Sequence, residues 1–309
     1  MPRTSVIIPT HNRPELLPRA VESAQLAGRD LEVVVVDDAS TDQTASVCRS
    51  LKDIKYVRVD RNQGVAGARN VGLLHSEGEF VTFLDDDDSR LPGSIDLQAR
   101  VLLENPEAGF VCGGMILTDQ NYQPTGEVTH PRHPGGDVFW KVLEFDFPAM
   151  GLSTLIRKEC LLRVGLLRPH LAGIDDWDLL ARLAEIYSGI VIPEAVGLYR
   201  YPTSSSAQGS SRATLLGRVA QHQWELFRLP RALTATKQFR KAVRRQATTR
   251  IADTLLSSAA RLVFKGELAP AFESVGIALR LRPSRICRPQ AYRKLAQAWM
   301  KRSPKLLSN

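Results

Sequence analysis

Short apolar runs and amphipathic stretches alternate along the N-terminal third of the chain. The apolar runs, rich in Val, Ile and Phe, predict buried strands at 5–9, 32–36, 56–59 and 80–84. Apolar residues at helical spacing between them predict helices at 14–27, 44–51 and 65–74. Strands that alternate with helices indicate an α/β domain, in which a mostly parallel sheet is flanked by helices on both faces.

Polar residues follow three of these predicted strands. Residues 10–13 come after the first strand, Asp37 and Asp38 after the second, and residues 85–88 after the fourth. In parallel sheets, ligands bind at the carboxyl ends of the strands. The sequence therefore predicts a binding site at this edge of the sheet.

Four consecutive aspartates occupy positions 85–88. Carboxylates this close repel one another and raise one another's pKa unless a cation neutralises them. Mg²⁺ or Mn²⁺ prefers such oxygen ligands and often completes its shell with water and substrate phosphate. The alternative is a solvated acidic turn that caps a helix beginning at Pro92. Taken alone, the run favours neither interpretation.

Five segments together resemble the family 2 glycosyltransferases of GT-A fold. Their order and spacing make the match specific, and they are residues 5–13, 36–44, 62–70, 83–88 and 173–182. The resemblance implies a Rossmann-like GT-A catalytic domain. It also implies a nucleotide-sugar donor, most often UDP-linked, and Mn²⁺ or Mg²⁺ as cofactor.

The resemblance assigns the nucleotide to the ends of the first two strands and to the acidic run. Thr10 and Asp38 are expected to contact the base or the ribose, with Asp37 nearby. A carboxylate that accepts from a base N–H or a ribose hydroxyl discriminates against ligands without that donor. Helix capping is the alternative for the acids and hydroxyls of residues 37–42. The expected nucleotide-binding residues are Pro9, Thr10, His11, Asn12, Arg13, Asp37, Asp38, Arg69, Asp85 and Asp86.

Small residues at 64 and 66–68 precede Arg69 at the start of a predicted helix. Helix N-terminal amides and an arginine suit a diphosphate, and the resemblance assigns Arg69 to it. Tight packing of the helix on the sheet is the alternative, and both can hold together. Arg200 is a further diphosphate candidate, in a stretch where many relatives carry a histidine. The Ser-rich run at 203–206 is either a mobile loop over the donor or a plain linker.

The family pattern Asp-x-Asp, followed at a fixed spacing by a proline such as Pro92, assigns the metal to Asp85 and Asp87. Asp87 is the better candidate ligand. The metal would neutralise charge on the departing diphosphate. For Asp86 and Asp88, a ribose contact, binding through water and capping of the next helix all stay open.

A second acidic segment, residues 175–178, precedes apolar residues at helical spacing and therefore lies at a helix start. By resemblance, Asp176 is the catalytic base that removes a proton from the acceptor hydroxyl, a role typically worth ~10²- to 10⁴-fold in rate. Asp175, in the place of the family's usual Glu, and Trp177 support the acceptor site. A single displacement inverts the anomeric carbon. The alternative is that the acids only complement the helix dipole.

At 309 residues, 43% of them hydrophobic, the chain is long enough for a catalytic core and a smaller unit. No stretch approaches the ~20 apolar residues that span a membrane, and the polar N-terminus does not resemble a signal peptide. The four cysteines form no Cys-x-x-Cys pair, which argues against a zinc site and fits a reducing cytoplasm.

Charge divides the chain unevenly. Residues 1–212 carry 21 Lys and Arg against 29 Asp and Glu, whereas residues 213–309 carry 20 against 4. We therefore predict a catalytic domain at 1–212 and a basic α-helical region at 213–309, with helices at 237–264 and 268–281. Such a region can bind an anionic membrane surface, at ~1 kcal/mol for each well-placed Lys or Arg. A solvated face or a protein contact is the alternative. Nucleic-acid binding is not expected, because no reader motif is present and aromatics are few.

These observations predict a metal-dependent inverting glycosyltransferase, hexosyltransferase-like, in the cytoplasm or peripheral on the inner face of the plasma membrane. Its acceptor would be a growing cell-envelope glycan or a lipid-linked saccharide. A sugar nucleotidyltransferase is the first alternative, but residues 9–13 lack its Gly-rich basic signature. The second is a non-catalytic nucleotide-sugar-binding assembly subunit, against which the presence of both Asp87 and Asp176 argues.

Overall fold

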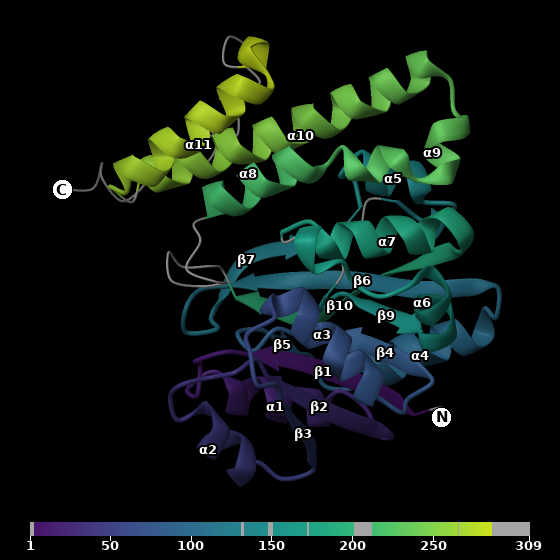
Figure 1. Ribbon diagram of the computed structural model, residues 1–309, viewed down its shortest axis with the longest axis vertical. Helices are drawn as coiled ribbons and strands as arrows, with labels where there is room; N and C mark the ends of the chain where they lie inside the picture. The colour runs from purple at the N-terminus through teal and green to yellow at the C-terminus, as the bar shows by residue number, and fades with distance from the viewer. Residues whose placement is uncertain are drawn as a thin grey trace. The chain divides into compact units, whose positions relative to one another are not determined.

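The computed structural model describes residues 3–130, 133–147, 151–171, 173–200, 212–264 and 266–285. The chain divides into two compact units, one made of Met1–Val142 and Asp146–Tyr201, the other of Leu143–Phe145 and Pro202–Asn309 (Figure 1). The functional division predicted between residues 212 and 213 stays a prediction.

The first unit is built on one sheet, to which ten strands of the described residues belong. The strands are β1 (Thr4–Thr10), β2 (Leu31–Asp37), β3 (Ile54–Arg58), β4 (Phe80–Phe83), β5 (Ser89–Arg90), β6 (Ala108–Thr118), β7 (Pro124–Thr129), β8 (Gly135–Gly136), β9 (Thr154–Arg157) and β10 (Ser188–Arg200). The main strand order is β3-β2-β1-β4-β9-β6-β10-β5, while β7 pairs with β6 and β8 with β10.

The sheet is parallel where the sequence predicted strands. β3, β2, β1 and β4 all run in the same direction, and Thr10 of β1 is paired with Asp37 of β2. β9 then runs antiparallel to both β4 and β6, and β10 runs parallel to β6. The register brings the polar segments that follow β1 and β2 to one edge.

Helices flank the sheet: α1 (Leu17–Leu26), α2 (Thr44–Ser50), α3 (Gly64–His75), α4 (Ser94–Glu104), α5 (Phe139–Leu143), α6 (Lys158–Val164) and α7 (Asp175–Ile186), with a 3₁₀ turn η1 (Pro169–Leu171). α4 begins at Ser94, after Gly93 has taken a left-handed conformation with φ of 69°. The acidic run is therefore separated from α4 by β5, and capping of that helix does not explain its charges.

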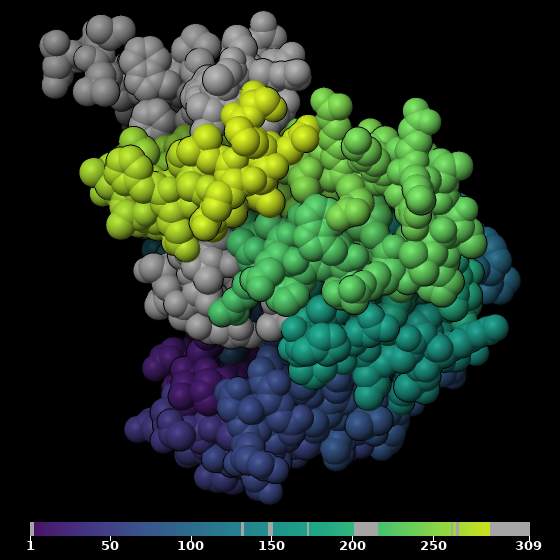
Figure 2. All heavy atoms as spheres, turned by 45° about the horizontal axis from the view of Figure 1, so that its top comes forward, coloured from purple at the N-terminus to yellow at the C-terminus, as the bar shows by residue number. Residues whose placement is uncertain are grey.

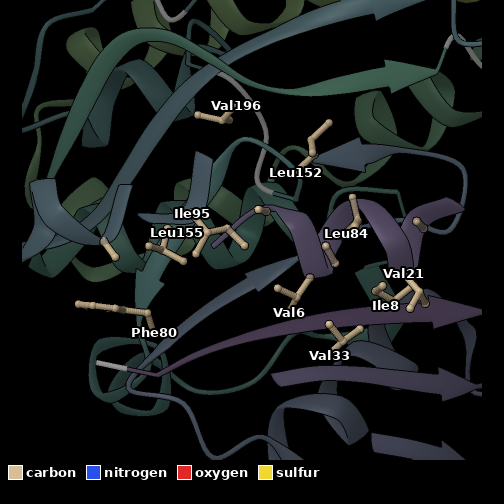
Figure 3. Close-up of a cluster of buried hydrophobic side chains, with 14 of the residues drawn as sticks. Val6, Ile8, Val21, Val33, Phe80, Leu84, Ile95, Leu152, Leu155 and Val196 are labelled. Atoms are coloured by element: carbon tan, nitrogen blue, oxygen red, sulfur yellow. The ribbon is translucent and has the colours of Figure 1, made fainter. Parts of the chain in front are cut away.

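Alternate residues of the central strands point to opposite faces of the sheet, and both faces are buried. Val6, Ile8 and Val33 belong to a cluster that also includes Phe80 and Leu155 (Figure 3). On the other face, α3 packs closely on β1 and β2 at Gly72, where an added Cβ would clash with the side chains of Ile7 and Val36. Burial on both faces explains why these strands read as continuous apolar runs.

From residue 212 on, the second unit is helical in its described part, 212–264 and 266–285, as the sequence predicted. It contains α8 (Arg212–His222), η2 (Glu225–Arg228), α9 (Pro230–Thr234), α10 (Lys237–Phe264), α11 (Leu268–Leu281) and η3 (Pro283–Arg285). α11 lies along α10 (Figure 1 and Figure 2). Val243, Ala247, Ile251 and Leu255 form the buried stripe of α10. Among the described residues, no helix combines the length and the apolar character that crossing a membrane would require.

Candidate active site

The segment that follows β1 is fastened to the loop that follows β2. The Asn12 amide donates to Ser40 Oγ over 3.0 Å, and Asn12 Oδ1 accepts from the Thr41 amide over 2.8 Å. His11 Nδ1 lies 2.7 Å from the Asp38 carbonyl oxygen. Asn12 takes a left-handed conformation, φ 54°, to make these contacts. The two loops therefore form one scaffold beside the strand ends.

Asp37 is buried and fully bonded within this scaffold. One carboxylate oxygen accepts from the Ser40 amide at 2.8 Å, and the other from the Tyr56 hydroxyl at 2.9 Å and from Arg58 Nη1 at 2.7 Å. Burial raises the pKa of Asp37, but the hydrogen bonds and the Arg58 charge outweigh burial and hold the pKa below its ordinary value. The contacts of Asp37 hold the loop, and the predicted nucleotide contact stays a prediction.

Asp38 joins the same scaffold to α3. Its Oδ1 accepts from the Gln63 amide at 2.7 Å, just before the helix begins. Burial raises the pKa of Asp38 despite this hydrogen bond. An open hollow is lined by Asp60, Arg61, Asn62 and Gln63. Asp38 thus lies next to a concave surface, and its predicted contact with the nucleoside stays a prediction.

Asp86 is directed toward the end of β1. Its two oxygens accept from Thr10 Oγ1 and Arg13 Nη1, each over 2.8 Å. Burial raises the pKa of Asp86 to about 7, although Arg13 and Thr10 oppose that shift. Thr10, Arg13 and Asp86, all predicted nucleotide-binding residues, are therefore brought into direct contact.

The other three aspartates of the run converge. Asp85, Asp87 and Asp88 each place a carboxylate oxygen within 4.8 Å of the others. A tight turn, in which the Asp88 amide donates to the Asp85 carbonyl at 3.0 Å, produces the convergence. Burial, followed by mutual repulsion, raises the pKa of Asp87 and Asp88. Three clustered oxygens with this electrostatic strain fit a hard divalent cation. Asp85 and Asp87 were the predicted ligands, and the turn adds Asp88.

Arg69 lies between the two acidic segments of the unit. Its Nη2 is 2.5 Å from Asp85 Oδ1, and its Nη1 is 3.7 Å from Asp175 Oδ2. The side chain is 8% exposed, and its Nε has no hydrogen-bond partner among the residues that the structure describes. Burial lowers the pKa of Arg69, but Asp85 and Asp175 outweigh burial and keep the guanidinium charged. A buried cation with an unused donor is suited to an anionic ligand.

The first turn of α7 contains acids of two kinds. Burial, together with the charge of Asp175, raises the pKa of Asp176 to about 7. Asp178 instead pairs with Arg182 at 2.8 Å and with Arg168 at 3.2 Å, and its side chain is 1% exposed. Asp178 is therefore a structural acid, whereas Asp176 keeps a proton affinity suited to a base near neutral pH.

The remaining predicted residues take up the following places. Pro9 lies within β1, and Trp177 is partly buried in the first turn of α7. Arg200 ends β10, where its amide donates to Asp88 Oδ1 at 2.9 Å and its Nε donates to the Gln120 carbonyl at 3.0 Å. The Ser-rich run at 203–206 lies outside the described residues. Arg200 thus lies beside the acidic trio of Asp85, Asp87 and Asp88.

Tyr122 was not found from the sequence. Its ring lies 5.5 Å from the Arg200 guanidinium, although it belongs to the turn between β6 and β7. The sequence carries no motif there, and only the sheet topology brings this turn to the end of β10.

The chain is similar to known proteins in sequence and in fold. The family model described as Glycosyl transferase family 2 matches residues 5–167. A GalNAc(5)-diNAcBac-PP-undecaprenol beta-1,3-glucosyltransferase of Campylobacter jejuni is 50% identical over 116 residues, which are 36% of this chain and 36% of that protein. The chain spans less than two thirds of the length of the curated relatives that it matches, for example 62% of the length of a Haemophilus influenzae glycosyltransferase.

Two solved structures share the fold. A mannosyltransferase from Pyrobaculum calidifontis, in complex with GDP-Man and Mn²⁺, has a TM-score of 0.54 and 22% identity, covering 97% of this chain and 80% of that one. S. aureus TarS 1–349 in complex with UDP has a TM-score of 0.52 and 19% identity, covering 93% of both chains. The predicted GT-A-type α/β fold is thereby confirmed.

Proposed function

Because the chain belongs to glycosyl transferase family 2, we propose that it moves a sugar from a nucleotide-sugar donor to a hydroxyl of a cell-envelope glycan or a lipid-linked saccharide. We take a UDP-sugar as the donor and inversion at the anomeric carbon as the outcome. The observation that carries the proposal is the meeting of three groups in one unit: the acidic trio, Arg69, and the acids that begin α7. The name of the Campylobacter relative, which includes a PP-undecaprenol saccharide, supports the acceptor class.

The donor half of the site is assigned to the strand ends. Asp38 and Thr10 would contact the nucleoside, next to the hollow at residues 60–63. Arg69 would bind the diphosphate, because it is a buried cation whose Nε has no hydrogen-bond partner among the described residues. Arg13 neutralises Asp86 and Asp87, at 2.8 and 3.1 Å, and so limits repulsion in the run.

The residues of the run fit a hard divalent cation, Mn²⁺ or Mg²⁺. Asp87 and Asp85 would hold it with Asp88 as a third oxygen ligand, since their oxygens lie within 4.8 Å of one another. A bound cation would act as a Lewis acid that neutralises the negative charge developing on the departing diphosphate. The Mn²⁺ in the Pyrobaculum complex supports this assignment.

The acceptor half is assigned to the start of α7. As the acceptor oxygen forms its bond to the anomeric carbon, the bond from that carbon to the diphosphate oxygen breaks, and the electron pair leaves with the diphosphate. The acceptor proton passes to the Asp176 carboxylate. A pKa of about 7 suits this role, because a base is most effective when its pKa lies near the working pH. Asp175, paired with Arg69, and Trp177 would support the acceptor.

A transfer assay tests the proposed function. The full chain is screened for thermal stabilisation by UDP- and GDP-sugars with Mn²⁺, and then assayed for release of the nucleoside diphosphate with and without a lipid-linked acceptor. We expect stabilisation by one donor and acceptor-dependent release. Binding without any release would favour the assembly subunit, and activity on a nucleoside triphosphate with a sugar phosphate would favour the nucleotidyltransferase.

We further propose that the second unit binds an anionic membrane surface. Lys237, Lys241 and Arg245 are exposed at four-residue spacing and therefore share one face of α10. On vesicles containing anionic lipid, replacing these three residues by Gln should reduce flotation, and added salt should reduce flotation of the unmodified chain. The matched control replaces Arg29, Arg49 and Lys52 of the first unit by Gln. Equal flotation of the two variants would contradict the proposal.

A further inference from the structure

Tyr122 is held in an unusual backbone conformation. Its φ is 60°, a left-handed value that is rare for an aromatic residue. Asp119 fixes the turn, since its carboxylate Oδ1 accepts from the Asn121 amide at 2.8 Å and from the Gln123 amide at 2.9 Å. The Tyr122 amide itself donates to the Asp119 carbonyl at 3.2 Å. The turn therefore maintains a strained residue in one orientation.

Two guanidinium groups lie close to the Tyr122 ring. Arg19 of α1 lies 3.9 Å from the ring centroid and Arg200 lies 5.5 Å from it, both within cation–π range. Arg200 is in turn bonded to the acidic trio through its amide and Asp88 Oδ1. The ring is thus fixed next to the proposed metal and diphosphate site.

The Tyr122 hydroxyl is buried. No residue that the structure describes forms a hydrogen bond with it. The charges of Asp87 and Asp88 reach it, because both add to the effect of burial in raising the Tyr122 pKa, against Arg200 and Arg19. A buried polar group without a partner is unfavourable, so it is commonly satisfied by a ligand or an ordered water.

We propose that the Tyr122 hydroxyl donates a hydrogen bond to a phosphate oxygen of the donor's diphosphate. The two nearby arginines make this corner of the site attractive to an anion. The phenol is a neutral donor, so it adds specificity for a phosphate oxygen without adding to the charge. The inference rests on the proposed function, because it takes a nucleoside diphosphate as the ligand.

The test compares Tyr122→Phe with the unmodified full chain. Dissociation constants of UDP and GDP with Mn²⁺, and of uridine and guanosine, are measured by calorimetry. Because Phe keeps the aromatic ring near both guanidinium groups, the loss of the hydroxyl should weaken diphosphate binding by about tenfold and leave nucleoside binding unchanged. Tyr187→Phe is the matched control, since Tyr187 follows the far end of α7, about 18 Å along the helix from Asp175.

Three outcomes would overturn the proposal for Tyr122. They are unchanged diphosphate affinity, an equal loss for nucleoside and diphosphate, and a fall of more than about 3 °C in the unfolding midpoint of ligand-free Tyr122→Phe, which would reveal a bond within the protein. If the unmodified chain binds neither diphosphate, the proposed function fails and this proposal fails with it. If the unmodified chain binds one and Tyr122→Phe binds it equally well, only the role of Tyr122 fails.

Discussion

Asp37, at the end of β2, and the acidic trio, which follows β4, lie on either side of β1 and differ in how their charges are satisfied. Both oxygens of Asp37 have donors in the protein, and its pKa is lowered. Asp87 and Asp88 crowd together with Asp85, and their pKa values are raised. Aspartates at equivalent places in the sheet therefore have different roles. Asp37 stabilises a loop, whereas the carboxylates of the trio repel one another until a ligand neutralises them.

The largest effect is expected at the trio. Asp87→Asn removes a proposed metal ligand and should lower turnover by at least about 10³-fold, while the free energy of unfolding stays the same or rises because repulsion is relieved. The Mn²⁺-dependent part of donor binding should vanish as well. Steady-state kinetics, calorimetry and urea unfolding measure the three quantities. Activity of this variant at the wild-type level in the presence of a chelator would contradict the metal assignment.

A second, smaller loss of rate is expected in α7. Asp176→Asn should lower kcat by at least about 10²-fold and leave the Kd of donor and Mn²⁺ nearly unchanged. Asp178→Asn is the comparison, because breaking the pairs of this buried carboxylate with Arg182 and Arg168 should lower stability and leave kcat of the folded enzyme close to wild type. Lost donor binding in Asp176→Asn would exclude the role of a base.

At Asp37 we expect the reverse of the Asp87 result. Asp37→Asn breaks the contacts with Arg58 and Tyr56 and should lower the free energy of unfolding by about 2 kcal/mol, a value kept modest because Arg58 is 43% exposed. Urea unfolding of this variant and of Asp87→Asn, side by side, measures the contrast. Unchanged stability with a specific loss of nucleoside affinity would instead make Asp37 a ligand contact.

The smallest expected effect is a pH dependence of metal-free stability. The pKa of Asp86 is about 7 in the folded protein against an ordinary value of 3.8, so the folded state binds the extra proton and loses stability as pH rises through that interval. Asp87 and Asp88 shift in the same direction, and Asp37 in the opposite one. With EDTA, the unfolding midpoint should fall by a few degrees between pH 5 and pH 8. Added Mn²⁺ should raise it more at pH 8 than at pH 5, and equal shifts would argue against binding by the trio.

Much of this arrangement could be predicted from the sequence, because strands buried on both faces and polar strand ends are local patterns. Which of Asp86 and Asp88 joins Asp85 and Asp87 could not be predicted. It depends on a turn that directs Asp86 toward Arg13 and Asp88 toward Asp85. Tyr122 could not be found either, because its contact with Arg200 depends on long-range pairing in the sheet. The ion pair of Asp178 with Arg182 could be predicted from the sequence, since acidic and basic residues at i and i+4 commonly meet on a helix.

One residue of this arrangement has no side chain at all. Gly72 lies about one helical turn after Arg69, at the point where α3 touches Ile7 and Val36. Gly72→Ala would retain every charged group of the site, yet its extra methyl group would push the helix away from the sheet and move the Arg69 guanidinium with it. In this chain, the position of the Arg69 guanidinium therefore depends on the missing side chain of Gly72 as well as on the charged groups around it.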